Sequence, residues 1–524
     1  MVSAKSLSPA GSLSSAKDEI DIMETPEGRT SEGLGDVNDE AHHPPALTVE
    51  EERKLWRKVD LRIVPILTVM YLCSFLDRGN IGNAKLQGLT TQLDLTGNKY
   101  NIALTMYYIP YCLLECPANL VLKKFRPSRW LSGTMVVWGI VMTLMGIVKT
   151  YPQLVGVRIC LGIAEAGLFP GVVYYMTLWY PRHMLQFRIG LFYGGASAAG
   201  AFSGVLAYGI SFMSGTGGLL GWSWIFIIEG LLTMVVSIIS IFVIVDFPDT
   251  ASFLTPKERA YLVWRKKYDN SSVGEEEHFE LRHVKSALCD WQVWLQTLMF
   301  MTIVAPLLGI SLFLPSIING FGYGTAISQL LTVPPYIVAT IVLVVVAIWS
   351  DHVKLRSPFI FGGLVMCLVG FAINISDAAI GAKYFGTSCV SLGRTLPARC
   401  HFMAGNNLAG QYKRGVGMAV QIGIGNLASL IVSNIYLSKD APRYVMGHAL
   451  ELMFIGIGLI NLPILVVLYK WENTKRDINA TRRGRERHRV LGGRAAKTGR
   501  PCHGLPLHSV TRVHTIFSSE QYKA

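Results

Sequence analysis

Apolar stretches long enough to cross a lipid bilayer constrain this chain more than any other feature of its sequence. A membrane-spanning helix needs about 20 predominantly apolar residues to cross a hydrocarbon core about 30 Å thick. Twelve stretches meet that requirement, so we predict an all-α membrane protein. The expected spans lie near residues 61–81, 99–122, 130–149, 153–177, 186–212, 222–245, 290–315, 326–349, 358–376, 378–404, 412–437 and 445–469.

The composition agrees with lipid as the solvent for most of the chain. Of its 524 residues, 51% are hydrophobic and 16% are charged, whereas soluble domains carry about 25% charged residues. The net charge of +13 would suggest nucleic acid in a soluble protein, but here the basic residues lie in short loops between apolar stretches. The nine cysteines show no metal-ligand spacing. We therefore expect a lipid bilayer as partner, no nucleic acid, and neither a metal nor a cofactor.

The distribution of Lys and Arg predicts the orientation, because cytoplasmic loops carry an excess of both. They cluster before the first span and in the loops after spans two, six and eight. The loops after spans five and seven contain neither residue. We therefore expect both termini in the cytoplasm.

The longest internal hydrophilic stretch divides the expected spans into two groups of six. Capping-box patterns at Thr48/Glu51 and Thr255/Glu258 predict amphipathic helices before the first span and within this stretch. The predicted organisation is a disordered cytoplasmic tail at 1–50, a six-helix bundle at 51–245, a cytoplasmic loop with an amphipathic helix at 246–288, a second six-helix bundle at 289–470 and a basic cytoplasmic tail at 471–524.

Ionisable side chains inside the first six spans are candidate functional residues, because an intramembrane charge costs several kcal/mol unless it is paired or hydrated. At 1.5 Å per residue, Asp77 lies about 21 Å from the inner side, and Arg158 lies about 7–8 Å below the outer side. Glu165 lies about two helical turns beyond Arg158 and faces the same way. We therefore expect Asp77, Arg78, Arg158 and Glu165 to line one cavity between spans one and four.

Two arginines and two carboxylates in such a cavity suit the co-transport of an organic anion with protons. Arginine binds a carboxylate through two parallel hydrogen bonds, and a buried Asp or Glu can carry a proton. Two other interpretations stay open, namely a static salt-bridge cluster, or Asp77 and Arg78 reaching the outer interface. Glu115, nearer the cytoplasmic end, is interpreted as a gate or packing residue, and Glu229 in span six receives no role.

Three segments resemble the major facilitator superfamily and, within it, the anion:cation symporter family. They are YLCSFLDRGNIGNAKLQGL at 71–89, RICLGIAEAGLFPGVVYYMTLWYPR at 158–182, and GNNLAGQYKRGVGMAVQIGIGNLASLIVSNIY with the following DAPRYVMGH at 405–448. The resemblance covers about residues 50–476 and is greatest to the fungal branch that includes allantoate and nicotinic acid permeases. It implies two pseudo-symmetric six-helix bundles that hold a substrate between them at the bilayer midplane.

The resemblance also implies roles for individual residues. Asp77 and Glu165 match the family's proton-coupling groups, and Arg78 and Arg158 match its anion-binding arginines. The segment WSDHVKLRSP at 349–358 is similar to the superfamily's cytoplasmic loop motif. It adds Asp351 and Arg356 to Glu115 as gating candidates. The equivalent loop after span two lacks the Asp-Arg core of that motif.

Two stretches depart from the family pattern. Residues 387–404 bring Arg394, Arg399 and His401 into span ten, and residues 478–524 form a basic tail. One hypothesis is that either stretch comes from a mis-spliced or frame-shifted gene model.

The expected function is import of a small organic anion, such as nicotinate, allantoate or a related vitamin or nitrogen source, by proton symport with alternating access. An anion alone would enter against a negative-inside potential at about 2.3 kcal/mol per charge per 100 mV, and accompanying protons offset that cost. The competing interpretation is a nutrient sensor of the same fold. No nucleophile constellation or phosphate loop indicates an enzyme. By resemblance, we expect the plasma membrane. We also expect a monomer, and Asn406, Asn407 and Asn426 are suggested as substrate contacts from the second half, although the sequence gives no signal that selects them.

Overall fold

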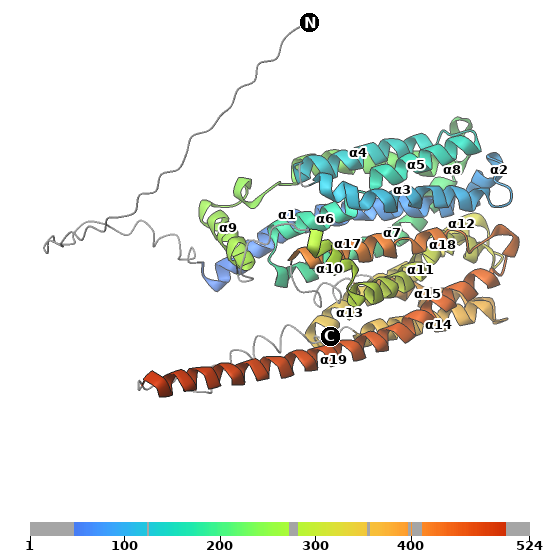
Figure 1. The fold of residues 1–524 in the computed structure, drawn as a ribbon. Coiled ribbons are helices and arrows are strands. Elements are labelled where there is room, and N and C mark those ends of the chain that lie inside the picture. Colours follow the sequence, from blue (N-terminus) through green and yellow to red (C-terminus); the bar gives the residue numbers. More distant parts are fainter. Residues whose placement is uncertain are drawn as a thin grey trace, which may run out of the picture. The chain divides into compact units, whose positions relative to one another are not determined.

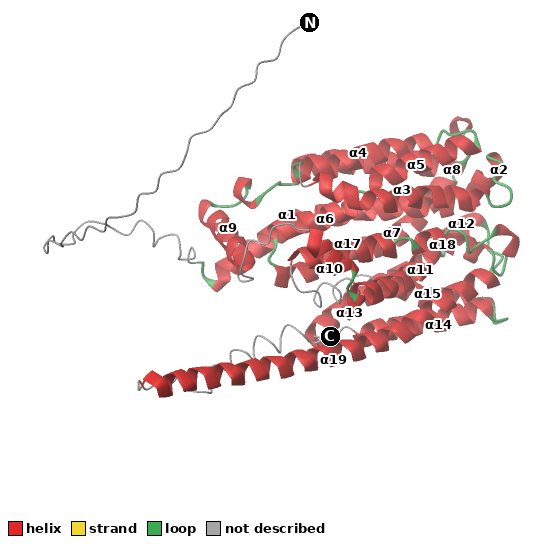
Figure 2. Ribbon diagram, viewed as in Figure 1, coloured by secondary structure: helices red, strands yellow, loops and turns green. Residues whose placement is uncertain are grey.

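A computed structural model describes residues 47–122, 125–271, 281–353, 357–396, Cys400 and 411–498. Helices account for most of these residues, and the described part of the chain contains no strand (Figure 2). The tail predicted at 1–50 lies outside the described residues as far as residue 46. The predicted all-α fold is confirmed.

The first six expected spans all have helical counterparts (Figure 1). The fourth span is broken near Gly167, so that it consists of two helices. A short π-helical segment, Lys85–Leu89, and α2 (Thr90–Gln92) follow the first span. The spans are α1 (Val49–Ala84), α3 (Lys99–Leu122), α4 (Pro127–Met145), α5 (Tyr151–Glu165) with α6 (Leu168–Trp179), α7 (Arg182–Ser211) and α8 (Gly221–Val243).

The last six expected spans also coincide with helices, several of them interrupted. Two loop helices, α9 (Pro256–Ser271) and α10 (Leu281–Leu288), precede them. The spans are α11 (Trp291–Asn319), α12 (Thr325–Leu330) with α13 (Val333–Val353), α14 (Ser357–Ile375), α15 (Ile380–Ser391), α17 (Gln411–Gly425) with α18 (Ala428–Val432), and α19 (Val445–Thr498).

Length and apolarity distinguish the clearest spans from the others. Within the described residues, eight helical stretches are long and apolar enough to cross a membrane. The expected spans near 99–122, 130–149, 378–404 and 412–437 correspond to α3, α4, α15 and the α17–α18 pair, which fall outside that set. In the last pair, a shorter apolar helix runs over Val416–Val432.

Each group of six spans packs mainly within itself. In the first group α4 packs on α8, α1 on α7 and α3 on α5, and in the second α11 and α14 both pack on α19. The two groups meet where α7 contacts α12 and α13, where α1 contacts α11, and where α3 contacts α17 and α18. These contacts bring residues from both halves to the central cavity described below.

Close contacts between the halves lie toward the end of the helices opposite α9, where α12 contacts α7 (Figure 1). A Cβ on Gly82 of α1 would lie 2.4 Å from the carbonyl oxygen of Leu312 in α11, so only glycine permits this approach. The amide of Asn101 donates to the carbonyl oxygen of Ser433 at 2.6 Å, and that of Gln87 donates to Gln329 Oε1 at 3.0 Å. Direct packing and hydrogen bonds therefore join the halves at this end.

Both predicted capping boxes are present. Thr48 and Glu51 cap α1, and Thr255 and Glu258 form the same reciprocal hydrogen bonds at the start of α9. The segment before the first span is not a separate amphipathic helix, because α1 continues from Val49 to Ala84 and includes both. Lys58 of α1 donates to Glu258 at 3.1 Å, which ties α9 to the first bundle.

The structure describes different amounts of the two stretches that depart from the family pattern, residues 387–404 and 478–524. Helix α15 ends at Ser391, a 3₁₀ turn follows over Leu392–Thr395, and residues 397–399 and 401–410 lie outside the described residues. In contrast, α19 is continuous for 54 residues and carries the last span into the basic tail. The hypothesis about the gene model stays untested for both stretches.

Replacing Gly162 with alanine is expected to lower the thermal stability of the protein. Its Cβ would lie 2.2 Å from the carbonyl oxygen of Tyr107, so the backbones of α5 and α3 would have to separate. Overpacking of this kind costs about 1–3 kcal/mol. The matched control is Gly156→Ala on the same helix, where a Cβ meets nothing within 4 Å.

The measurement is the unfolding temperature of each fluorescently tagged variant in detergent. The expected result is a lower unfolding temperature for Gly162→Ala and little change for Gly156→Ala. Equal unfolding temperatures would contradict the close approach of α3 and α5.

Candidate functional site

A buried ion pair joins α1 to α5. The Nε of Arg78 donates to Glu165 Oε1 at 2.7 Å. Glu165 is 0% exposed and also accepts hydrogen bonds from the hydroxyl groups of Ser74 and, at 2.5 Å, Tyr107. These donors satisfy both oxygens of Glu165, as a charge removed from water requires.

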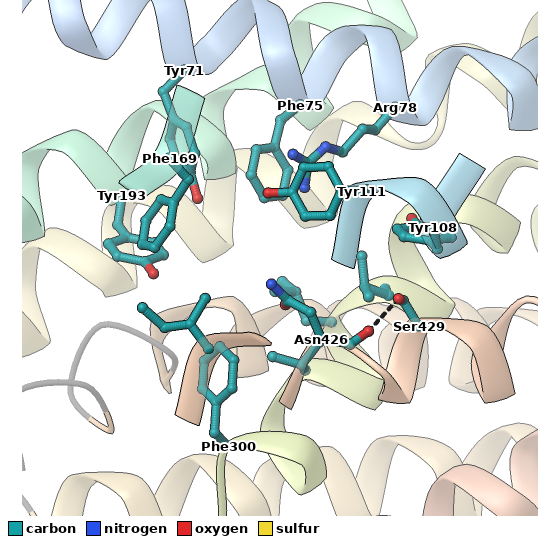
Figure 3. Close-up of a pocket in the computed structure, with 14 residues that line it drawn as sticks. Tyr71, Phe75, Arg78, Tyr108, Tyr111, Phe169, Tyr193, Phe300, Asn426 and Ser429 are labelled. Carbon is teal, nitrogen blue, oxygen red and sulfur yellow. Dashed lines mark hydrogen bonds between the residues drawn. The ribbon is translucent and has the colours of Figure 1, made fainter. Parts of the chain in front are cut away.

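Aromatic rings surround the guanidinium group of Arg78. Its central carbon lies 4.6 Å from the ring centroid of Tyr111, 5.3 Å from that of Phe75 and 5.9 Å from that of Tyr107. An arginine stacked in this way gains cation–π attraction and loses rotational freedom. The ion pair and the rings together hold the guanidinium at one place in the cavity wall (Figure 3).

The cavity beside Arg78 lies between the two halves and holds about 550 Å³ of empty space, which includes space open to solvent. Of the described residues that line it, Arg78 is the charged one, and most of the others are aromatic or aliphatic. In Figure 3, Asn426 and Ser429 of the second half lie across the cavity from Arg78 and Tyr111 of the first. The lining residues are Tyr71, Phe75, Arg78, Tyr108, Tyr111, Phe169, Tyr193, Phe300, Val304, Leu307, Leu308, Ile422, Asn426 and Ser429.

Asp77 lies outside this cavity. Its Oδ2 accepts hydrogen bonds from Trp138 Nε1 in α4 at 2.7 Å and from the hydroxyl of Thr233 in α8 at 3.0 Å. Successive residues of an α-helix point about 100° apart. Asp77 therefore faces α4 and α8, whereas Arg78 faces α5 and the cavity.

Arg158 is buried in α5 and also lies outside the cavity lining. Its side chain is 2% exposed, and within the described residues its Nε and Nη2 atoms have no hydrogen-bond partner. The structure therefore does not bring the four predicted residues into one cavity. Arg78 lines the cavity with Glu165 paired behind it, and Asp77 and Arg158 lie elsewhere.

Of the three gating candidates, the structure describes the side chain of Glu115. Its Oε2 accepts a hydrogen bond from Asn426 Nδ2 at 3.1 Å, which links α3 of the first half to the turn between α17 and α18 of the second. Asp351 belongs to α13, but its side chain and all of Arg356 lie outside the described residues. Asn406 and Asn407 lie outside them as well.

Reasoning from the sequence missed the aromatic lining of the cavity. A signal was available in YYIPY, because Tyr107 and Tyr111 are four residues apart and therefore share one face of α3. Phe169 and Tyr193 gave no comparable signal, because aromatic residues in a membrane helix also face lipid and neighbouring helices. The buried partners of Asp77, Trp138 and Thr233, were also missed, because the sequence does not show which helices pack against Asp77.

Comparison with known proteins agrees with the fold and with the class of function. The Major Facilitator Superfamily profile matches residues 67–459. The "MFS-type transporter efuF" of Hormonema carpetanum is 33% identical over 425 residues, which are 80% of this chain and 86% of the relative. The "High-affinity nicotinic acid transporter" of Saccharomyces cerevisiae is 30% identical over 426 residues, which are 81% of this chain and 79% of the relative.

Solved structures show the same architecture at low sequence identity. The xylose transporter XylE from E. coli, in a partially occluded inward open conformation, aligns with a TM-score of 0.58 and 14% identity over 79% of this chain and 97% of that one. A bacterial homologue of the human lysosomal transporter Spinster, in an occupied inward-facing conformation, aligns with a TM-score of 0.57 over 77% of this chain and 96% of that one. The chain therefore belongs to the major facilitator superfamily and is a multi-pass membrane transporter, not an enzyme.

Proposed function

We propose that this transporter imports a small organic anion together with protons and binds the anion's carboxylate at Arg78. The observation that carries the proposal is that, among the described residues, Arg78 is the one arginine in the wall of a cavity that is otherwise aromatic, aliphatic or weakly polar. Such a cavity attracts an anion at one point and accepts an apolar body elsewhere. We place the transporter in the plasma membrane, in agreement with the resemblance, and both termini in the cytoplasm, in agreement with the loop charges. We also propose that it acts as a monomer.

The lining favours an anion that carries a planar ring. Tyr111, Phe169 and Tyr193 present ring faces and edges to the space beside Arg78. Aromatic pairs contribute about 0.5–1.5 kcal/mol beyond the area that they bury. Asn426 and Ser429 can hydrogen-bond the far end of the ligand from the second half. The nicotinic acid transporter among the relatives supports this choice of substrate class.

Glu165 is the proposed link between proton binding and anion binding. While it is ionised, it holds Arg78 through the 2.7 Å ion pair. A proton on Glu165 removes that attraction and frees the guanidinium group to bind a carboxylate through two hydrogen bonds. The carrier then moves the anion and the proton together, which offsets the cost of moving negative charge into a negative-inside cell.

Asn426 connects the binding site to the proposed gate. Its side chain lines the cavity and donates to Glu115 at 3.1 Å, so a ligand near Asn426 acts directly on a contact between the halves. Breaking and remaking that contact is our proposed contribution of Glu115 to alternating access. The anion-binding role of Arg158, the proton-coupling role of Asp77, and the gating roles of Asp351 and Arg356 stay predictions from the resemblance.

The first test is uptake of radiolabelled nicotinate by permease-deficient yeast that expresses the transporter. Uptake is expected to rise as the external pH falls and to be lost when a protonophore removes the gradient. Cells with the empty vector are the control. Uptake that responds to neither treatment would refute proton symport, and absence of uptake for nicotinate and for a panel of other carboxylates would refute organic anion import.

The second test is the substitution Arg78→Lys. A lysine keeps the charge but cannot form two parallel hydrogen bonds with a carboxylate. Because a hydrogen bond to a charged group contributes about 1.5–3 kcal/mol, we expect nicotinate uptake to fall about 10-fold or more.

The matched control is Lys85→Arg in the segment that follows α1. Lys85 lies over the ring of Tyr100 and outside the cavity lining, so this reverse exchange is expected to leave uptake unchanged. Surface expression of both variants is measured by fluorescence. If a well-expressed Arg78→Lys variant takes up nicotinate as fast as the wild type, the proposal that Arg78 binds the anion is wrong.

A further inference from the structure

A second buried group of polar side chains lies between α1 and α8. It contains two carboxylates, Asp77 and Glu229, each 1% exposed. Trp138 and Thr233 donate to one oxygen of Asp77, and the amide of Asn80 donates to one oxygen of Glu229. We call Asp77 and Glu229 the α1–α8 carboxyl pair.

The spacing of these residues shows how the pair is arranged. Asp77 and Asn80 are three residues apart on α1, and Glu229 and Thr233 are four apart on α8, so each set shares one helix face. Asp77 bonds to Thr233, and Asn80 bonds to Glu229. The two carboxylates therefore occupy successive levels of the same helix–helix contact.

Each carboxylate keeps one oxygen without a partner. Asp77 Oδ1 and Glu229 Oε1 are buried and have no hydrogen-bond partner within the described residues. An unpartnered ionised oxygen in an apolar interior is costly, and a proton on the carboxyl group removes that cost. Each of the two carboxylates thus has a free oxygen that can accept a proton, and protonation lowers the free-energy cost of its burial.

No cation bonds to the pair in the part of the chain that the structure describes. All hydrogen-bond donors to its oxygens are neutral side chains of α1, α4 and α8. The other titratable groups that act on it are Cys73 of α1 and Glu165 of α5, and Arg78 bonds to Glu165. Two ionised carboxylates without a cation repel each other, so such pairs bind a proton as a unit.

We propose that Asp77 and Glu229 together hold one transported proton at a site separate from the anion cavity. The proposal rests on proton symport as the function, and it adds Glu229 as a coupling residue. The proton binds to one carboxyl group while the other stays ionised. It leaves to water when the site opens to the opposite side of the membrane.

A chain of polar side chains connects the pair to a second cavity. Ser203 of α7 donates to Asn80 Oδ1 at 3.4 Å and accepts from Asn83 Nδ2 at 2.8 Å. Asn83 and Ser203 line this second cavity, whose other walls include Ser311 of α11 and Tyr336 of α13 and whose empty space of about 350 Å³ includes space open to solvent. Because the walls come from both halves, their relative movement changes the access of water to the pair.

The test is a pH titration of the purified protein in lipid nanodiscs, followed by the infrared band of protonated carboxyl groups. This measurement needs no substrate. Asp77→Asn and Glu229→Gln are each expected to shift the midpoint of the remaining carboxyl group by at least about 1 pH unit, because strongly coupled groups titrate together. The double variant is expected to lose that titration step.

The matched control is Glu451→Gln in α19. Glu451 is a buried carboxylate whose two oxygens have no hydrogen-bond partner within the described residues, but it lies in the second half. This variant is expected to remove one independent band and leave the titration of the pair unchanged. Glu229→Asp keeps a carboxyl group and is expected to restore a coupled titration, which separates loss of the proton site from misfolding.

Independent titration of the two residues, in which each single variant leaves the other midpoint unchanged, would overturn the proposal. A midpoint that moves with sodium concentration would assign the pair to a metal cation and would also overturn it. Failure of proton-driven uptake in the wild type refutes the proposed function, whereas intact proton-driven uptake with independent titration refutes only the shared site.

Discussion

The ion pair between Arg78 and Glu165 is the interaction on which the rest of the site depends. A charge in the membrane interior is tolerated when its partners are complete, and here Ser74 and Tyr107 complete the hydrogen bonding of Glu165. The pair fixes α1 against α5 and sets the position of the guanidinium group. The aromatic side chains then have a fixed cation around which to pack, and the cavity wall carries a positive charge at a defined point, where we propose that the anion binds.

Buried ion pairs contribute little net stability, because desolvation consumes most of the attraction between the charges. We interpret the Arg78–Glu165 pair as an interaction that can break and re-form during transport. In the proposed mechanism, a proton or a competing carboxylate weakens the ion pair between Glu165 and Arg78 while the surrounding rings stay in place. Stability comes instead from close helix contacts such as the one between Gly162 and the backbone of Tyr107.

Hydropathy predicted where the helices lie, because the bilayer imposes one length and one polarity on each span. Among the described residues, eight helical stretches meet that length and polarity, and four of the twelve expected spans fall outside them. The capping residues Thr48 and Thr255 were equally predictable, since a cap depends on neighbours three residues away. The depth estimate placed Asp77 level with Arg158, whereas in the structure it is Arg78 that pairs, and its partner is Glu165, about two turns from Arg158. The estimate also did not give the direction of Asp77. The depth of a residue in the membrane follows from its position along the helix. The direction of its side chain relative to the other helices depends on which of them pack on each face, and neighbouring residues in the sequence do not show that.

The continuous helix α1 gives the dipeptide Asp77-Arg78 a consequence of its own. Its two members are neighbours in sequence, yet one bonds to Trp138 and Thr233 while the other pairs with Glu165 beside the cavity. A rigid helix cannot turn one of them without turning the other by the same angle. The position of the dipeptide along α1 therefore determines the direction of both side chains. One residue inserted before it within the helix would rotate both side chains by about 100° about the helix axis, and neither would then meet its present partners.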